Sequence, residues 1–221
     1  SEGPTGHGSR FIADTAVSKL IGVANKALEF RSKEESKLGY SGGCKHCNAK
    51  KLGDVTTLNL TMLKTGVSSD EGKTYALNVI PTCAEAGFDV RVPTCVPCQD
   101  IEAMLNDWCK EEGLSWKYAP WAGTPITEHY VSSIDEKASP FWATIMKTFQ
   151  DEFGLKLEPE VFPAGTDSRF LRENGIPSYG FSPMKNSPIL LHEHNEYLDI
   201  DVFKEGVGVY TTLLPRLANL I

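Results

Sequence analysis

The fold of this chain is indicated first by the stretch AEAGFDVRV, residues 84–92. Every second residue is apolar, and polar residues or glycine fill the positions between them. This period of two predicts a β-strand with one face in a core and the other toward solvent. Arg91 belongs to the polar set, so we expect its side chain to project away from the apolar face.

Helices and strands are predicted on both sides of this strand in a regular order. Before it, apolar residues recur at helical spacing from Val17 to Leu28, and after it a second helical pattern runs from Ile101 to Cys109. The predicted elements are strands over residues 6–10, 55–62, 84–92 and 114–118, and helices from about residue 15 to 37 and from residue 101 to near 113. Their order, β-α-β-β-α-β, predicts an α/β unit of the ferredoxin-like type.

The second half of the chain has a different rhythm and predicts a separate unit. Residues 120–138 are rich in proline, glycine, threonine and serine and lack a period, which is typical of a crossing between domains. We therefore predict domains over residues 1–122 and 123–221. In the second domain, helices are predicted over residues 140–153, 166–174 and 201–217, and strands over residues 155–162 and 177–182. This alternation implies a parallel or mixed sheet and suggests the C-terminal part of a larger α/β domain.

Composition and charge exclude two classes of partner. The 221 residues carry a formal net charge of -7 and an isoelectric point near 5.3, with scattered lysine and arginine, which argues against a nucleic-acid surface. No apolar run approaches the roughly 18 to 20 residues that span a bilayer, so we expect a soluble globular protein without a membrane partner. Because the first residue is Ser1, we also expect these residues to be a piece of a longer chain.

Four places combine polar side chains with backbone that a ligand can approach. His7 stands between two glycines, and Asn78 precedes the strand that ends near Arg91, so that an amide and a guanidinium could grip a carboxylate. Residues 163–167, PAGTD, lie before a predicted helix, whose N–H groups and dipole favour an anion. His192 follows an apolar run and is a candidate metal ligand. Each place also has an ordinary alternative. His7 could simply be exposed, Arg91 could be solvated, and residues 163–167 could be a capped loop. His192 is a single imidazole, which makes no zinc site alone.

Two C-x-x-C pairs, Cys44 with Cys47 and Cys95 with Cys98, form a separate pattern. Their distance apart in the sequence is far larger than in common zinc ribbons. In a β-α-β-β-α-β unit, however, the two loops that carry them emerge at the same end, so the four cysteines are a candidate structural zinc site. Reduced surface thiols and disulfide bonds are the alternatives.

Six short motifs, taken in their order along the chain, resemble the zinc-dependent aminoacylase and carboxypeptidase family. The motifs are GHGSRF at residues 6–11, NVIP at 78–81, FDVRV at 88–92, GTDSR at 165–169, GFSPM at 180–184 and LHEHNE at 191–196. Each motif is weak alone, and their common order over nearly the whole chain carries the resemblance. It implies an inserted ferredoxin-like lid domain that mediates dimerisation, followed by the C-terminal part of an α/β zinc-hydrolase catalytic domain.

The resemblance also implies roles for individual residues. His7 matches the lid histidine that reaches into the active site of the partner subunit and stabilises the oxyanion of the tetrahedral intermediate. Asn78 and Arg91 match lid residues that bind the substrate, and Arg91 is expected to hold the α-carboxylate of the amino acid. Gly165 and Thr166 match the loop that lines the substrate pocket.

His192 matches the last ligand of the family's centre of two Zn²⁺ ions, and residues 194–196 follow it as candidates for groups that orient it. The family's other ligands, a His-x-Asp pair, a further Asp and a Glu-Glu pair that includes the general base, have no counterpart in suitable context here. The expected parent protein is a cytoplasmic, homodimeric zinc hydrolase of N-acyl-L-amino acids, and these 221 residues alone are expected to be inactive. The alternatives are a non-catalytic dimerisation or binding module and a dipeptidase or carboxypeptidase of the same family.

Overall fold

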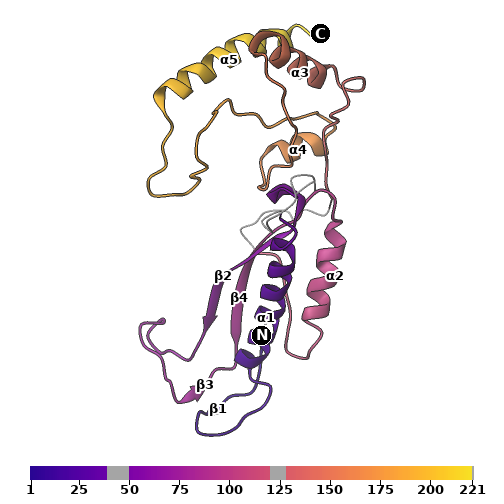
Figure 1. Cartoon of the computed structure of the whole chain (residues 1–221). Helices are drawn as coiled ribbons and strands as arrows, with labels where there is room; N and C mark the ends of the chain where they lie inside the picture. The colour runs from indigo at the N-terminus through magenta and orange to yellow at the C-terminus, as the bar shows by residue number, and fades with distance from the viewer. Residues whose placement is uncertain (39–49, 120–127, 221) are drawn as a thin grey trace. The chain divides into compact units, whose positions relative to one another are not determined.

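The chain forms two compact units, Ser1–His129 and Tyr130–Ile221. The computed structural model describes residues 1–38, 50–119 and 128–220, and Figure 1 shows their helices and strands. The first unit is mixed α/β, whereas the described part of the second consists of helices joined by segments without regular secondary structure. The assignment of the two parts as a lid domain and a catalytic portion stays a prediction.

A two-stranded antiparallel sheet forms the centre of the first unit. It pairs β2 (Thr57–Thr65) with β4 (Ala84–Arg91), and Leu58 lies opposite Val90 on the face that is buried. Leu58 is only 1% exposed, which makes it one of the most completely buried side chains described. The strand predicted from the alternation of residues 84–92 is therefore confirmed.

The N-terminal segment extends this sheet without forming a regular strand. The Ser1 ammonium donates to the carbonyl oxygen of Ala84 at 2.8 Å, and the Ala84 N–H donates back to the Ser1 carbonyl oxygen at 2.9 Å. On its other side, the Glu2 N–H donates to the carbonyl oxygen of Gly113 at 2.7 Å. The segment thus lies between the start of β4 and the part of the chain that follows the second helix.

A second, smaller sheet continues from this segment. It pairs β1 (Gly6–His7) antiparallel with β3 (Val79–Ile80), so that His7 lies opposite Val79. Figure 1 shows that this pair lies beyond the first residue of β4, Ala84. The strand predicted over residues 6–10 is therefore present only as two residues, because the chain turns after His7, where the Arg10 N–H donates to the His7 carbonyl oxygen.

Two helices pack against the apolar side of β2 and β4. Helix α1 (Ala16–Glu35) is capped by Thr15, whose side chain accepts the Ser18 N–H at 3.2 Å, and α2 is Cys98–Trp108. Their shared core consists of Val23, Ala27, Leu58 and Trp108, with Phe30, Phe88, Val90, Met104, Leu105 and Leu114 packed around it. Both helices were predicted, although α2 starts three residues earlier than the apolar period and ends at Trp108.

The strand predicted over residues 114–118 is wrong. The alternating residues of this stretch instead contact α2: the Trp116 indole N–H donates to Asn106 at 2.8 Å, and the Tyr118 hydroxyl donates to Glu102 at 2.7 Å. The two aromatic rings also meet edge to face at 5.3 Å. The alternating residues of this stretch therefore pack against α2 and do not pair with a strand. The ferredoxin-like description of the unit stays a prediction.

The three helices described in the second unit lie close to the ranges predicted from the sequence. Helix α3 (Pro140–Phe153) is capped by Ser139 and ends at Gly154, which adopts the left-handed backbone conformation with φ of 62°. Helix α4 is Ser168–Glu173, and α5 is Ile200–Ala218, where the Asp199 side chain accepts two backbone N–H groups. The core consists of Trp142, Ile145, Phe149 and Leu213, with Met146, Phe153, Leu157, Tyr179, Phe181, Val209 and Leu217 packed around it.

The sheet predicted in the second unit does not form within the described residues 130–220. Residues 155–162 and 177–182 form neither a helix nor a strand. Side chains satisfy part of the backbone instead, since the Ser132 hydroxyl both accepts the Ser178 N–H at 2.8 Å and donates to its carbonyl oxygen at 3.0 Å. Apolar alternation cannot make a sheet unless a second strand lies beside it.

No helix in the described part of the chain combines the length and the apolar character needed to cross a membrane.

Candidate functional site

The end of the first unit formed by β1 and β3 carries two of the predicted site residues. Pairing of the two strands brings His7 opposite Val79, and the Gly8 N–H donates to the carbonyl oxygen of Asn78 at 2.8 Å. Both His7 and Asn78 are exposed. The structure therefore gathers onto one small surface an imidazole and an amide that are 71 residues apart in the numbering.

Ser9 holds the imidazole of His7 in one orientation. The Ser9 N–H donates to Nδ1 of His7 at 3.2 Å, and the Ser9 hydroxyl lies 2.8 Å from the same nitrogen. Because a backbone N–H can only donate, Nδ1 accepts, and the proton of the neutral ring is on Nε2. Sequence reasoning missed this role of Ser9, although its position two residues after His7 was the available signal.

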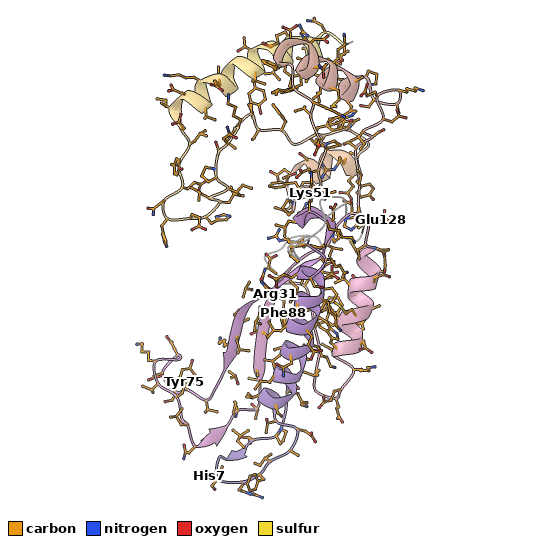
Figure 2. All side chains as sticks on the ribbon, in the orientation of Figure 1. His7, Arg31, Lys51, Tyr75, Phe88 and Glu128 are labelled. Atoms are coloured by element: carbon orange, nitrogen blue, oxygen red, sulfur yellow. The ribbon has the colours of Figure 1, made fainter. Side chains whose placement is uncertain are left out.

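Arg91 lies at the opposite end of β4 from β1 and β3. It is the last residue of the strand, and the strand begins at Ala84 beside the N-terminal segment. At about 3.3 Å per residue, the length of the strand separates the two ends by roughly 23 Å. Figure 2 shows His7 away from Phe88, a residue of β4 that lies three positions before Arg91.

The Arg91 guanidinium forms a paired interaction with Asp89 on the same side of β4. Nε lies 2.5 Å from Oδ1, and Nη2 lies 2.6 Å from Oδ2. The hydrogen bonds to Asp89 raise the pKa of Arg91 above its ordinary value, and partial burial opposes this rise. Both side chains keep more than two-fifths of their surface exposed, and the guanidinium keeps N–H groups that Asp89 does not use.

The other predicted site residues belong to the second unit. Gly165 and Thr166 lie in the exposed loop before α4, and the Thr166 carbonyl oxygen accepts the Arg169 N–H at 3.1 Å. A Cβ atom added to Gly165 would meet nothing within 4 Å, so packing inside this chain does not require glycine there.

His192 lies in an exposed turn and has an unusual backbone. Its φ of 66° falls in the left-handed region that most side chains avoid. Such conformations occur preferentially at ligand and active sites, where surrounding structure maintains them. Residues 194–196 are exposed in the same segment.

The described residues do not form a metal cage. Within residues 1–38, 50–119 and 128–220, no three His, Cys, Asp or Glu side chains gather closely enough to hold an ion. His192 by itself supplies one ligand, whereas zinc sites use three or four. Of the two C-x-x-C pairs, Cys44 and Cys47 lie outside the described residues, and Cys95 and Cys98 are free thiols.

Comparison with known proteins defines the class to which the chain belongs. The sequence profile of "Peptidase family M20/M25/M40" matches residues 27–216, so the chain belongs to this family. Aminoacylase-1 of Dictyostelium discoideum is 42% identical over 218 residues, which cover 99% of this chain and 51% of that protein. Aminoacylase-1A of Rattus norvegicus is 42% identical and Aminoacylase-1 of Homo sapiens 40% identical, each over the whole of this chain and 50% of its own length. The chain thus spans about half the length of the curated relatives it matches.

A solved structure with low sequence identity to this chain shares its fold. It is the M20 family metallo-carboxypeptidase Sso-CP2 from Sulfolobus solfataricus, with a TM-score of 0.50 and 14% identity. The match covers 96% of this chain and 47% of that one.

Proposed function

We propose that the protein hydrolyses the amide bond of N-acyl-L-amino acids, adding water to give a carboxylate and a free L-amino acid. The observation that carries the proposal is the similarity to aminoacylase-1 proteins over the full length of the chain, at 40 to 42% identity. The geometry of the exposed residues described above supports the roles that follow.

His7 is proposed to stabilise the negative oxygen that forms when water adds to the scissile carbonyl. With Nδ1 engaged by Ser9, the Nε2 proton is the one available to donate, and His7 is exposed to an approaching ligand. A donor of this kind in an oxyanion hole stabilises a transition state by about 3 kcal/mol. Asn78 is proposed to bind the substrate beside it.

Arg91 is proposed to hold the α-carboxylate of the amino acid through the guanidinium N–H groups that Asp89 does not use. A small substrate cannot reach His7 and Arg91 of one chain together, because the length of β4 lies between them. A homodimer removes this conflict: His7 and Asn78 of one subunit would serve the site to which Arg91 of the other subunit belongs.

The second unit is proposed to supply pocket lining and one metal ligand. Gly165 and Thr166 would line the substrate pocket, and His192 would bind one of two zinc ions. When bound, the metal would supply an activated water. Because the described residues lack a cage for it, the remaining ligands and the general base are proposed to come from a part of the protein that this chain does not contain.

An uncovered apolar surface on α5 supports such a missing part. Ile200, Phe203, Val207 and Leu214 are each more than half exposed, and their spacing puts them along one side of the helix. An adjacent side of α5, roughly 100° around the helix, is already buried, since Leu213 belongs to the core with α3. A helix that is apolar on two sides is typical of one covered on both.

The activity assay compares two proteins. The 221-residue chain alone, supplied with zinc, is expected to give no turnover of N-acetyl-L-methionine. A fusion that places the unmatched half of the rat Aminoacylase-1A before this chain is expected to hydrolyse it. Turnover by the chain alone would refute the proposed division of ligands, and a folded, zinc-loaded fusion without turnover would refute the proposed reaction.

A second candidate is a dipeptidase or carboxypeptidase activity. The shared fold with the Sulfolobus solfataricus metallo-carboxypeptidase favours it. Recognition of a free α-carboxylate by Arg91 would suit both kinds of substrate. The same fusion assayed with methionine dipeptides and N-acetyl-L-methionine distinguishes the two by the ratio of their kcat/KM values.

A further inference from the structure

His129 and Cys98 meet across 31 residues of chain at the start of α2. Nε2 of His129 lies 3.5 Å from the sulfur of Cys98 and 3.0 Å from the carbonyl oxygen of Val96. Cys98 is the first residue of α2 and is buried, and His129 is the last residue of the first unit. Figure 2 shows the neighbouring Glu128 beside the same end of α2.

The distance between the two atoms is that of two ligands on one zinc ion. Zinc binds cysteine sulfur at about 2.3 Å and histidine nitrogen at about 2.0 to 2.1 Å with tetrahedral angles, which puts the sulfur and the nitrogen about 3.5 Å apart. The observed separation of 3.5 Å therefore matches that of two ligands on one zinc ion.

Cys95 supplies a third donor on the same turn. It precedes Cys98 by three positions in the sequence CVPC, the spacing of many zinc-binding cysteine pairs. The turn is closed by the Val96 N–H, which donates to the Pro93 carbonyl oxygen at 3.0 Å. No three such side chains in the described ranges already surround one point, so binding requires the exposed Cys95 side chain to rotate toward the pair.

The imidazole of His129 is engaged by the backbone in the metal-free chain. A carbonyl oxygen can only accept, so Nε2 of His129 carries the proton that it donates to Val96. A bound metal would displace this proton and the thiol protons.

We propose that Cys95, Cys98 and His129 are ligands of a structural zinc ion in the first unit. The ion would fasten the end of the first unit, at His129, to the loop that leads into α2. It is separate from the metal proposed for hydrolysis, because none of its ligands belongs to the set that His192 would join. Thiolate ligands also give it a spectroscopic signature that imidazole and carboxylate ligands lack.

The test titrates the metal-free 221-residue chain with Co²⁺. One equivalent is expected to produce thiolate-to-cobalt charge-transfer bands in the near ultraviolet and intense tetrahedral bands in the visible, and Zn²⁺ is expected to abolish both. Replacing Cys95 and Cys98 together by serine should remove the charge-transfer bands. His129→Ala should weaken cobalt binding by at least about tenfold, and His129→Cys should restore it with stronger charge transfer.

Two variants serve as matched controls. Cys83→Ser removes an exposed thiol outside the proposed site, and His192→Ala removes the histidine assigned to the other metal. Neither should change the charge-transfer bands. The wild-type chain provides a test that needs no variant: Zn²⁺ should slow alkylation of Cys95 and Cys98 while leaving Cys83 unchanged.

The proposal is overturned by any of four results. The first is a titration without charge-transfer bands, and the second is bands that persist in the double serine variant. The third is a His129→Ala variant that binds cobalt as tightly as the wild-type chain. Alkylation of Cys95 and Cys98 at the same rate with and without Zn²⁺ would also refute it.

Discussion

The guanidinium of Arg91 lies in a two-point contact with the carboxylate of Asp89, two residues earlier on β4, with nitrogen to oxygen distances of 2.5 and 2.6 Å. The contact holds the planar fork in one orientation on an accessible surface. An exposed pair of this kind adds at most about 1 kcal/mol to stability. Its significance is therefore the geometry that it gives to Arg91.

Arg91→Ala is expected to raise the KM of the fused enzyme for N-acetyl-L-methionine roughly 10- to 150-fold. The lost hydrogen bonds to a charged group account for about 1.5 to 3 kcal/mol. The KM of Arg91→Lys should lie between those of wild type and Arg91→Ala, because lysine keeps the charge and lacks the fork. N-acetyl-L-methionine amide, which has no carboxylate, is the control substrate: an equal loss for both substrates would contradict the proposed contact.

Mixed dimers test whether His7 and Arg91 serve different sites. In the fused enzyme, His7→Ala and Arg91→Ala are each expected to be severely impaired, by about 100- to 1000-fold in kcat for His7→Ala. When the two variants are mixed and allowed to exchange subunits, one of the two sites in each mixed dimer would contain wild-type His7 and wild-type Arg91. Activity should then rise toward half of the wild-type value per mixed dimer.

The outcome of this mixing depends directly on the separation along β4. If one subunit supplied both residues to the same site, every site in the mixed dimer would lack one of them, and no activity would return. Asn78→Ala should behave like His7→Ala in the mixing assay, since β1 and β3 keep these two residues together.

Glu34→Ala is expected to lower the free energy of unfolding by about 1 to 3 kcal/mol. The Glu34 carboxylate is nearly buried and accepts the Thr56 N–H at 3.1 Å, and it also contacts Lys37. Removing it leaves the buried N–H of Thr56 without an acceptor. The neighbouring Glu35→Ala is the matched control, because Glu35 is 58% exposed in its ion pair with Arg31. Urea unfolding measures the free energy of unfolding of both variants. Equal decreases in the two would refute the role of Glu34.

The Tyr118 hydroxyl is expected to lose its proton at a higher pH than an ordinary tyrosine. Desolvation, the hydrogen bond to Glu102 and the charge of Glu102 raise its pKa to about 12 from the ordinary value of 10.0. Because the folded chain favours the neutral phenol, the contribution of this hydrogen bond is complete below pH 10 and is lost as the pH rises from about 10 to about 12. Phenolate absorbance of the wild-type chain minus that of Tyr118→Phe should show this single step.

Glu102→Gln provides the complementary measurement. It keeps an acceptor for the Tyr118 hydroxyl and removes the negative charge, so the pKa of Tyr118 should fall toward its ordinary value. An unchanged titration would mean that the charge of Glu102 has no part in the shift.

Much of the local structure could be predicted because its signals are local. The alternation of residues 84–92 predicted β4, and Ser139 with Gly154 marked both ends of α3. The same alternation misled at residues 114–118 and 177–182, because a strand also needs a neighbouring strand for its backbone groups. The hydroxyl of Tyr118 instead donates a hydrogen bond to Glu102 of α2.

The sequence by itself determined the residue types of the candidate site, the helical segments and the family resemblance, since composition, period and capping depend on neighbours a few positions away. Only the tertiary structure decided which of these residues meet. Antiparallel pairing of β1 with β3 brings His7 to Asn78, while the length of β4 keeps Arg91 away from both. The contact of His129 with Cys98 has no local signal, because chain closure over 31 residues creates it.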